Sequence, residues 1–263
     1  MPSSVLLTLD PRGIATVMLN RPDKHNAFDA DLIGNLHDTF AQLEDDNTVR
    51  AVVLTGAGKS FCAGADLEHM QRMSAATESE NFSDAMVVAR CMRKLDEFSK
   101  PVVARINGNA FGGGIGLIAC ADIAIASSAA KFTLSEVRLG LAAAVISPYV
   151  LAALGPRSAR RLLLTAATFD CDEALQLGLI HQHVDGEQLD QAVDQQVALL
   201  LQGGPAAQQA SKKLLREASS LTSEDRDMIA ARTAKVLARL RKSTEGREGL
   251  QAFLQKRKPD WSR

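Results

Sequence analysis

The chain has 263 residues, with 30 Lys and Arg against 31 Asp and Glu, so its formal net charge is −1. This length is enough to bury a substantial core in one large domain, and 46% hydrophobic with 23% charged residues is ordinary for a globular protein. The balanced charge gives no overall field that would attract nucleic acid or a membrane surface. Aromatic residues make up 4% of the chain, which leaves few stacking platforms for single-stranded nucleic acid.

The cysteines and the lengths of the apolar segments indicate the cellular compartment in which the protein works. Four cysteines lie far apart without a CxxC pair, namely Cys62, Cys91, Cys120 and Cys171. Scattered thiols of this kind indicate reduced packing residues. No apolar run approaches the ~18–20 residues that span a bilayer, and the MPSS start does not resemble a signal peptide. We therefore expect a cytoplasmic protein with no membrane or nucleic-acid partner.

The first half of the chain alternates short apolar runs with amphipathic segments. Apolar runs at 5–9 and 15–20 flank the turn signal DPRG, which predicts a β-hairpin. Asp29 is placed to cap a helix whose apolar positions follow the helical period, and a second amphipathic helix is expected over 81–98. Buried strands are expected at 51–55, 101–106 and 123–126, and glycine-rich loops follow the first two.

After residue 140 the pattern is almost wholly helical. Helical spacing covers 157–165, 172–178, 187–201, 205–218 and 222–241. Buried strands that alternate with helices, followed by helices alone, predict an α/β fold with a C-terminal helical region. The QGGP segment at 202–205 marks the expected boundary, which gives a core over 1–202 and a helical region over 203–263.

Two glycine-rich loops are the strongest candidates for a binding site: FCAGADL at 61–67 and NGNAFGGGIG at 107–116. Small residues let a ligand approach the backbone closely, so that peptide N–H groups point at it. A helix that begins near Gly114 would add the positive end of its dipole, and two converging N–H groups would stabilise an oxyanion. The same glycines also suit tight turns and close strand–helix packing, and composition alone does not separate these interpretations.

Motifs for cofactors and metals fail on their spacing. GKS at 58–60 lacks the earlier glycine of a P-loop, because that position is Val53. GIGLIA at 114–119 fits a dinucleotide pattern, but its loop comes too late in the order of predicted strands. His181 and His183 lack partners at zinc spacing. We expect no cofactor and no metal.

Five motifs follow one another along the chain: RPDKHNAF at 21–28, SFCAGADL at 60–67, NGNAFGGG at 107–114, CADIAIA at 120–126 and FTLSEVRLG at 132–140. Together they resemble the enoyl-CoA hydratase/isomerase (crotonase) superfamily. The resemblance implies a crotonase-type spiral of ββα units, with C-terminal helices that drive assembly into a homotrimer or a dimer of trimers. It also implies an acyl-CoA thioester as the substrate, with coenzyme A as part of that substrate.

The resemblance further implies roles for individual residues. The backbone N–H groups of Ala63 and Gly113 would hold the thioester oxygen of an enolate, and Glu136 would be the general acid and base. Residues expected along the acyl-CoA channel are Ala63, Gly64, Ala65, Asp66 and Leu67. Lys24 and Ala27 match positions near the pantetheine and nucleotide of CoA.

One position departs from the family pattern. Hydratases of the best-known type use two glutamates; Glu136 matches the second, whereas the first falls on Gly116, which has no side chain to move a proton. Apolar neighbours such as Leu134 and Val137 would suit the pKa of Glu136 to acid–base work. A single carboxylate fits a hydratase, or a double-bond isomerase that carries one proton between two carbons. A non-catalytic acyl-CoA-binding or RNA-binding member of the fold is the alternative from another class.

Further segments, FGGGIGL at 111–117, SEVRLGL at 135–141 and VISPYV at 145–150, resemble the bacterial branch labelled methylglutaconyl-CoA or γ-carboxygeranoyl-CoA hydratase. That branch also has glycine at the first-glutamate position. The resemblance implies a hydro-lyase for a branched, carboxylated enoyl-CoA such as 3-methylglutaconyl-CoA, in leucine or acyclic-terpene breakdown. Arg138 is the nearest cation in sequence for a substrate carboxylate, but its two-residue spacing from Glu136 favours a surface ion pair. The basic tail of Lys256, Arg257 and Lys258 is expected to meet either CoA phosphates or solvent.

Overall fold

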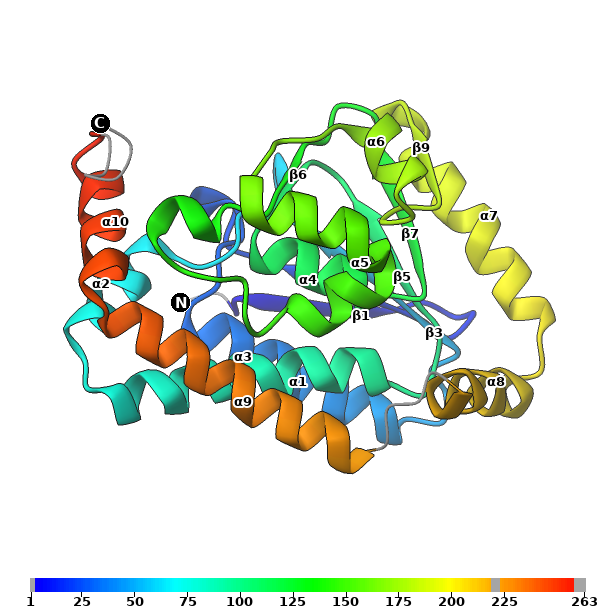
Figure 1. Ribbon diagram of the computed structural model, residues 1–263. Helices are drawn as coiled ribbons and strands as arrows, with labels where there is room; N and C mark the ends of the chain where they lie inside the picture. The colour runs from blue at the N-terminus through cyan, green and yellow to red at the C-terminus, as the bar shows by residue number, and fades with distance from the viewer. Residues whose placement is uncertain (1–2, 219–222, 258–263) are drawn as a thin grey trace.

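The computed structural model describes residues 3–218 and 223–257, and two sheets organise them (Figure 1). The large sheet has the order β1 (Val5–Leu9), β2 (Ile14–Leu19), β3 (Ala51–Gly56), β5 (Val102–Ile106), β7 (Ile123–Ser127) and β9 (Gln182–Val184). Its first pair is antiparallel, as the predicted hairpin requires, and the other neighbours are parallel. The small sheet is parallel and contains β4 (Ser60–Cys62), β6 (Asn109–Phe111) and β8 (Phe132–Thr133).

Strands alternate between the two sheets along the chain. β3 leads to β4, β5 to β6 and β7 to β8, and each pair runs into a helix: α2 (Leu67–Ala75), α4 (Gly113–Ala119) and the 3-10 helix η2 (Glu136–Leu139). This repeated step confirms the predicted α/β spiral of ββα units. Because β4, β6 and β8 are parallel, their carboxyl ends lie on the same side of the small sheet, and the segments that follow them start there. Those segments are the two glycine-rich loops and the turn that carries Glu136.

The remaining helices enclose the sheets. They are η1 (Pro22–Lys24), α1 (Ala30–Asp45), α3 (Glu78–Glu97), α5 (Ser147–Thr165), α6 (Cys171–Gln176), η3 (Gly186–Gln188), α7 (Leu189–Gln202), α8 (Pro205–Ala218), α9 (Ser223–Lys242) and α10 (Thr244–Leu254). Asp29 caps α1 as predicted, since its side chain accepts the N–H of Leu32 at 2.8 Å. No helix in the described part of the chain is long and apolar enough to cross a membrane.

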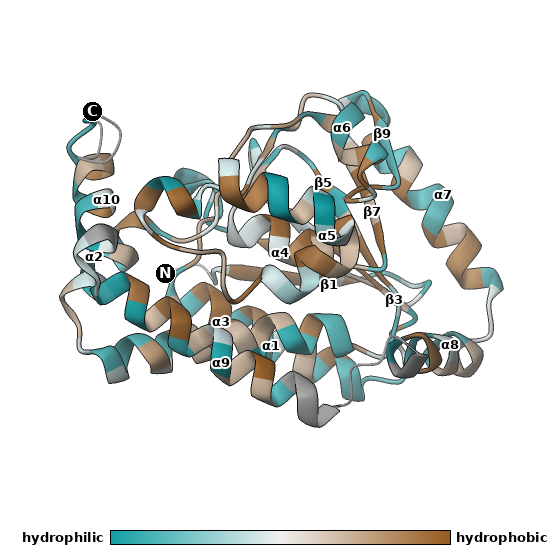
Figure 2. Cartoon of the chain, in the orientation of Figure 1, coloured by the Kyte–Doolittle hydropathy of each residue, from teal (hydrophilic) through white to brown (hydrophobic). Residues whose placement is uncertain are grey.

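The large sheet separates two apolar clusters. The main core contains the buried face of α1 with residues of α3, α4 and α5, and includes an edge-to-face pair of Phe40 and Phe98 with ring centroids 5.0 Å apart. The smaller cluster joins Val53, Val103 and Ile125 of the sheet to α7. In Figure 2 strands β1 and β7 are largely brown, whereas α7 alternates between teal and brown along its length. Central strands buried on both faces read as continuous apolar runs, which is why the sequence pattern predicts them.

Several elements differ from the sequence prediction. The small sheet was not predicted because its strands have two or three residues, too few for an alternating pattern. β9 shows that the expectation of an almost wholly helical chain after residue 140 was wrong in part. α5 begins earlier than the expected 157, because one more helical segment precedes a kink at Gly155, whose φ is +70° and which is followed by Pro156.

The helices after the expected boundary at 202–205 pack back onto the core. Figure 1 shows α9 running along α3 and α10 standing beside α2, and α10 also contacts η2. Two glycines let α10 approach closely: a Cβ on Gly249 would lie 2.2 Å from the carbonyl oxygen of Leu139, and one on Gly246 would lie 2.2 Å from that of Leu240. The C-terminal helices therefore support η2, while their role in assembly stays a prediction.

Candidate active site

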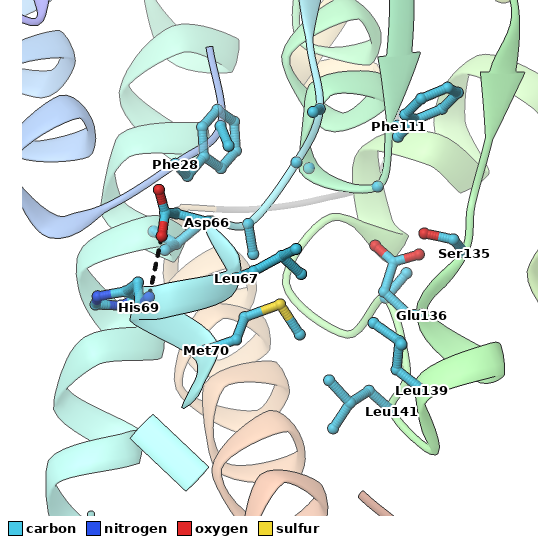
Figure 3. A pocket seen from close by; sticks show the side chains of 18 of the residues that line it. Phe28, Asp66, Leu67, His69, Met70, Phe111, Ser135, Glu136, Leu139 and Leu141 are labelled. Atoms are coloured by element: carbon cyan, nitrogen blue, oxygen red, sulfur yellow. Dashed lines mark hydrogen bonds between the residues drawn. The ribbon is translucent and has the colours of Figure 1, made fainter. Parts of the chain in front are cut away.

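A cavity of about 900 Å³ opens at the edge of the small sheet where the three ββα segments meet. Its walls come from the two glycine-rich loops, η2 and the helices α2, α3, α9 and α10 (Figure 3). The predicted site residues all line it: Lys24, Ala27, Ala63, Gly64, Ala65, Asp66, Leu67, Gly113 and Glu136. The fold thus brings together residues from four separate segments of the sequence.

The first of these segments is held by Asn26. This residue is fully buried and has a left-handed φ of +57°, a conformation that asparagine tolerates better than most residues. Its side-chain amide donates to the carbonyl oxygens of Ala57 and Ser60 at 2.9 and 2.8 Å, and its Oδ1 accepts the N–H of Arg21. Asn26 therefore fixes the 21–28 loop to the β3–β4 turn. The motif at 21–28 did not indicate this role.

The two glycine-rich loops pack backbone against backbone. Gly64 has a φ of +82°, and a Cβ on it would lie 2.8 Å from the carbonyl oxygen of Phe111 and 3.4 Å from the nitrogen of Gly113. A Cβ on Gly114 would lie 2.5 Å from the carbonyl oxygen of Cys62. Close packing is therefore one reason for these glycines, and it places the peptide groups of the two loops side by side.

The peptide N–H groups in this region differ in whether they are already bonded. The N–H of Ala63 donates to the carbonyl oxygen of His25 at 3.0 Å, so the prediction that Ala63 offers a free donor is wrong. Further along this segment, the N–H of Phe28 donates to the carbonyl oxygen of Gly64, and the carbonyl oxygen of Phe28 accepts the N–H of Asp66. These two bonds lie on either side of Ala65. Because bonding alternates along an extended segment, the N–H of Ala65 points away from Phe28.

Ala65 and Gly113 carry the donors that remain available. Gly113 is the first residue of α4, and N–H groups at a helix start have no intrahelical acceptor. Neither N–H has an acceptor among the residues that the structure describes. The candidate pair of backbone donors is therefore Ala65 and Gly113 rather than Ala63 and Gly113.

Glu136 begins η2, and its carboxylate points toward the second glycine-rich loop (Figure 3). Its Oε1 lies 2.9 Å from where a Cβ would stand on Gly112, so the absence of a side chain there makes room for the carboxylate. Its Oε2 is buried and has no hydrogen-bond partner within the described residues. Burial raises the pKa of Glu136 to about 7, although a backbone hydrogen bond opposes the shift. A carboxyl group with such a pKa both accepts and donates protons near neutrality.

The position of the missing first glutamate is closed by apolar atoms. A Cβ on Gly116 would lie 2.4 Å from Cγ2 of Ile146 and 3.4 Å from Cε of Met92. Gly116 is buried, and Ile146 lines the cavity. The packing leaves no room for a carboxylate at residue 116.

Comparisons with known proteins confirm the resemblance that the five motifs indicated. The family model for enoyl-CoA hydratase/isomerase matches residues 10–263. The chain belongs to the enoyl-CoA hydratase/isomerase family. A crotonyl-CoA hydratase from Syntrophomonas wolfei is 36% identical over 250 residues, which cover 94% of each protein. A carnitinyl-CoA dehydratase from Proteus mirabilis is 33% identical over 262 residues, which cover 97% of each.

A solved structure of an enoyl-CoA hydratase from Shewanella pealeana shares 42% sequence identity with this chain. It aligns with a TM-score of 0.79 over 98% of this chain and 96% of its own. The names of the two curated relatives differ in the acyl group that they specify. Membership in the enoyl-CoA hydratase/isomerase family therefore fits more than one acyl group.

In this family member, Asp66 and Lys24 hold the site together as well as lining it. Oδ1 of Asp66 caps α2 by accepting the N–H groups of Glu68 and His69, and Oδ2 lies 3.0 Å from Nη2 of Arg21. Burial raises the pKa of Asp66, but these hydrogen bonds and the Arg21 charge outweigh it and keep the pKa below its usual value. Nζ of Lys24 lies 2.6 Å from Glu68 in the more exposed part of the lining.

Two other expectations concerned basic residues. Arg138 lines the cavity, and its Nη2 donates to the carbonyl oxygen of Ala166 at 2.6 Å. Within the described part of the chain it forms no ion pair, so the expected surface ion pair is not found. In the basic tail, Arg257 pairs with Glu248 at 2.6 Å, while Lys258 lies outside the described residues. The function of the tail stays a prediction.

The cavity wall formed by helices was not predicted. His69 and Met70 of α2, Asp84 of α3, and Leu237 and Arg241 of α9 all line it. The apolar period of α9 predicts a helix, but it does not show which element that helix covers. No motif signal marked these residues.

Proposed function

We propose that the protein is an enoyl-CoA hydratase, a lyase that adds water across the 2,3 double bond of an acyl-CoA thioester. Glu136 carries this proposal: its buried carboxyl group, with a pKa of about 7, lies beside the loop that supplies the Gly113 N–H. Membership in the family and relatives named as hydratases support the reaction class.

The N–H groups of Ala65 and Gly113 form the oxyanion hole in this proposal. Both donate to the thioester oxygen, which becomes negatively charged as the enolate forms. Fixed donors aimed at developing charge stabilise the transition state, and the loss of one typically costs about 3–4 kcal/mol of barrier.

Glu136 moves the proton in both halves of the reaction. Its ionised form takes a proton from water while the water oxygen bonds to C3 and the π electrons move to the thioester oxygen. The neutral carboxyl group then returns that proton to C2 as the enolate collapses to the thioester. One carboxyl group serves as base and then as acid, since Gly116 supplies no second one.

We extend the proposal to a branched, carboxylated acyl group such as that of 3-methylglutaconyl-CoA, in leucine or acyclic-terpene breakdown. The motifs at 111–117, 135–141 and 145–150 support this choice by their resemblance. The cavity lining supports it as well, because it includes apolar residues such as Met70 and Val87 together with the polar residues His69 and Arg241.

A double-bond isomerase is the second candidate, and the lone carboxylate favours it. Glu136 would take a proton from C2 of a 3-enoyl-CoA and return it to C4 of the dienolate, without water. Ultraviolet absorbance of the conjugated thioester separates the two reactions. A hydratase lowers the absorbance of crotonyl-CoA and 3-methylglutaconyl-CoA, whereas an isomerase leaves these unchanged and raises the absorbance of a 3-enoyl-CoA solution. The second result would overturn the proposed hydration.

A further inference from the structure

Three polar side chains from three helices meet at the cavity wall: His69 of α2, Asp84 of α3 and Arg241 of α9. Nε2 of His69 lies 2.7 Å from Oδ1 of Asp84, and Nη1 of Arg241 lies 2.6 Å from Oδ2. The three side chains are only 11%, 13% and 9% exposed. In Figure 3 His69 and Glu136 stand on different sides of the pocket. The cluster is thus separate from the groups that the proposed reaction uses.

The cluster has more hydrogen-bond donors than acceptors. Both oxygens of Asp84 are taken by His69 and Arg241. Burial raises the pKa of Asp84, but the hydrogen bond from His69 and the charge of Arg241 outweigh it, so the pKa lies below its usual value and the group is ionised. Nε of Arg241 is buried and has no acceptor among the described residues. The protein therefore leaves the guanidinium of Arg241 incompletely paired, since only its Nη1 has an acceptor within the described residues.

The surroundings of the cluster suit the end of an acyl chain. Met70, Val87, Val88 and Leu237 come from the same three helices and line the same cavity. Nη2 of Arg72, an exposed residue, lies 3.3 Å from Nδ1 of His69, so both ring nitrogens of His69 are engaged within the protein. Apolar walls would hold methylene groups, and the guanidinium of Arg241 would meet the group that ends the acyl chain.

We propose that His69, Asp84 and Arg241 form a subsite that binds a carboxylate at the far end of the acyl group. A carboxylate is the acceptor that matches a guanidinium best, since it takes two parallel N–H bonds and carries the opposite charge. Asp84 holds Arg241 and His69 in place and leaves the other N–H groups of Arg241 for the ligand. This subsite selects carboxylated over purely apolar acyl groups, and it rests on the proposal that the cavity takes an acyl-CoA.

Two saturated thioesters test the subsite without turnover. Glutaryl-CoA and valeryl-CoA have five acyl carbons each and differ in ending with a carboxylate or a methyl group. Calorimetric titration of the wild-type protein is expected to give a Kd for glutaryl-CoA at least about tenfold below that for valeryl-CoA, the range of a charge-assisted hydrogen bond. Arg241→Met should abolish this preference and His69→Gln should reduce it, while the Kd of valeryl-CoA stays unchanged.

Two further variants keep the test decisive. Arg239→Met removes an exposed cation from the same helix and should retain the full preference. Arg241→Lys keeps the charge and should retain part of it, which covers the case that Arg241→Met does not fold. Equal Kd values for the two esters in the wild type would overturn the subsite. Variants that weaken both esters equally would overturn it too, because the cluster would then only link α9 to α2 and α3.

Turnover of crotonyl-CoA separates this inference from the proposed function. Normal hydration without any preference for glutaryl-CoA refutes the subsite alone. A preference for glutaryl-CoA in a protein that hydrates no ester refutes the hydratase alone.

Discussion

Glu136 affects folding as well as the proposed chemistry, and the effect has a defined pH dependence. Burial raises its pKa from 4.5 to about 7 in the folded chain. Below pH 4.5 the group is protonated in both the folded and the unfolded state, so its burial carries no electrostatic cost. Between 4.5 and 7 the unfolded chain ionises first, and the free energy of unfolding falls. Above about pH 7 the group is ionised in both states, and the free energy of unfolding falls no further. A pKa shift of this size corresponds to a total loss of about 3 kcal/mol in the free energy of unfolding.

Glu136→Gln removes this titration while it keeps the shape of the side chain. We expect the variant to be more stable than the wild type by about 3 kcal/mol above pH 7, and the difference to shrink toward zero as the pH falls to 4.5. Urea denaturation of both proteins between pH 4.5 and 8.5, at one protein concentration, measures the difference. Glu187→Gln, at an exposed position on η3, is the control for the general effect of removing one negative charge. A difference that does not change with pH, or a variant less stable than the wild type at pH 8, would refute the reasoning.

The site gives rise to three other predictions. The value of kcat/KM for hydration of crotonyl-CoA should rise with pH through about 7 as Glu136 ionises, and a flat profile between pH 6 and 8 would contradict its role as base. Gly116→Glu should lower Tm without raising kcat, because its Cβ would overlap Ile146, and overpacking typically costs about 1–3 kcal/mol. A more active variant would contradict this, because it would show that Ile146 moves to admit the new side chain. Replacing the amide N–H of Ala65 by an ester should lower kcat about 10²–10³-fold, whereas the same change at Ala63 should lower stability and leave kcat unchanged. Equal losses of kcat at the two positions would contradict the assignment of the donor pair.

The sequence predicts those parts of the fold whose signal is local. β3, β5 and β7 are mainly apolar runs, and α1 combines a capping residue with a helical apolar period, so neighbouring residues suffice to identify them. β4, β6 and β8 are defined instead by pairing between distant segments, and β8 has only Phe132 and Thr133. Such strands depend on tertiary contacts that the pattern does not contain.

The same distinction holds for the site. Motifs placed the glycine-rich loops and Glu136 in one cavity, and the structure confirms that they line it together. Whether a particular N–H is free depends on contacts between loops, and Ala63 is bonded to His25 for that reason. Likewise Arg241 reaches Asp84 only because α9 packs on α3, which its helical period does not encode.

The most direct test of the proposed hydration is mass spectrometry of 3-methylglutaconyl-CoA and crotonyl-CoA after incubation in oxygen-18 water with wild-type protein and with Glu136→Gln. We expect the wild type to add one labelled water to at least one ester, with the carboxylated ester preferred. We expect Glu136→Gln to incorporate almost no label although it still binds the esters. Normal incorporation by Glu136→Gln would contradict the role of Glu136, and no incorporation by the wild type into either ester would contradict hydration.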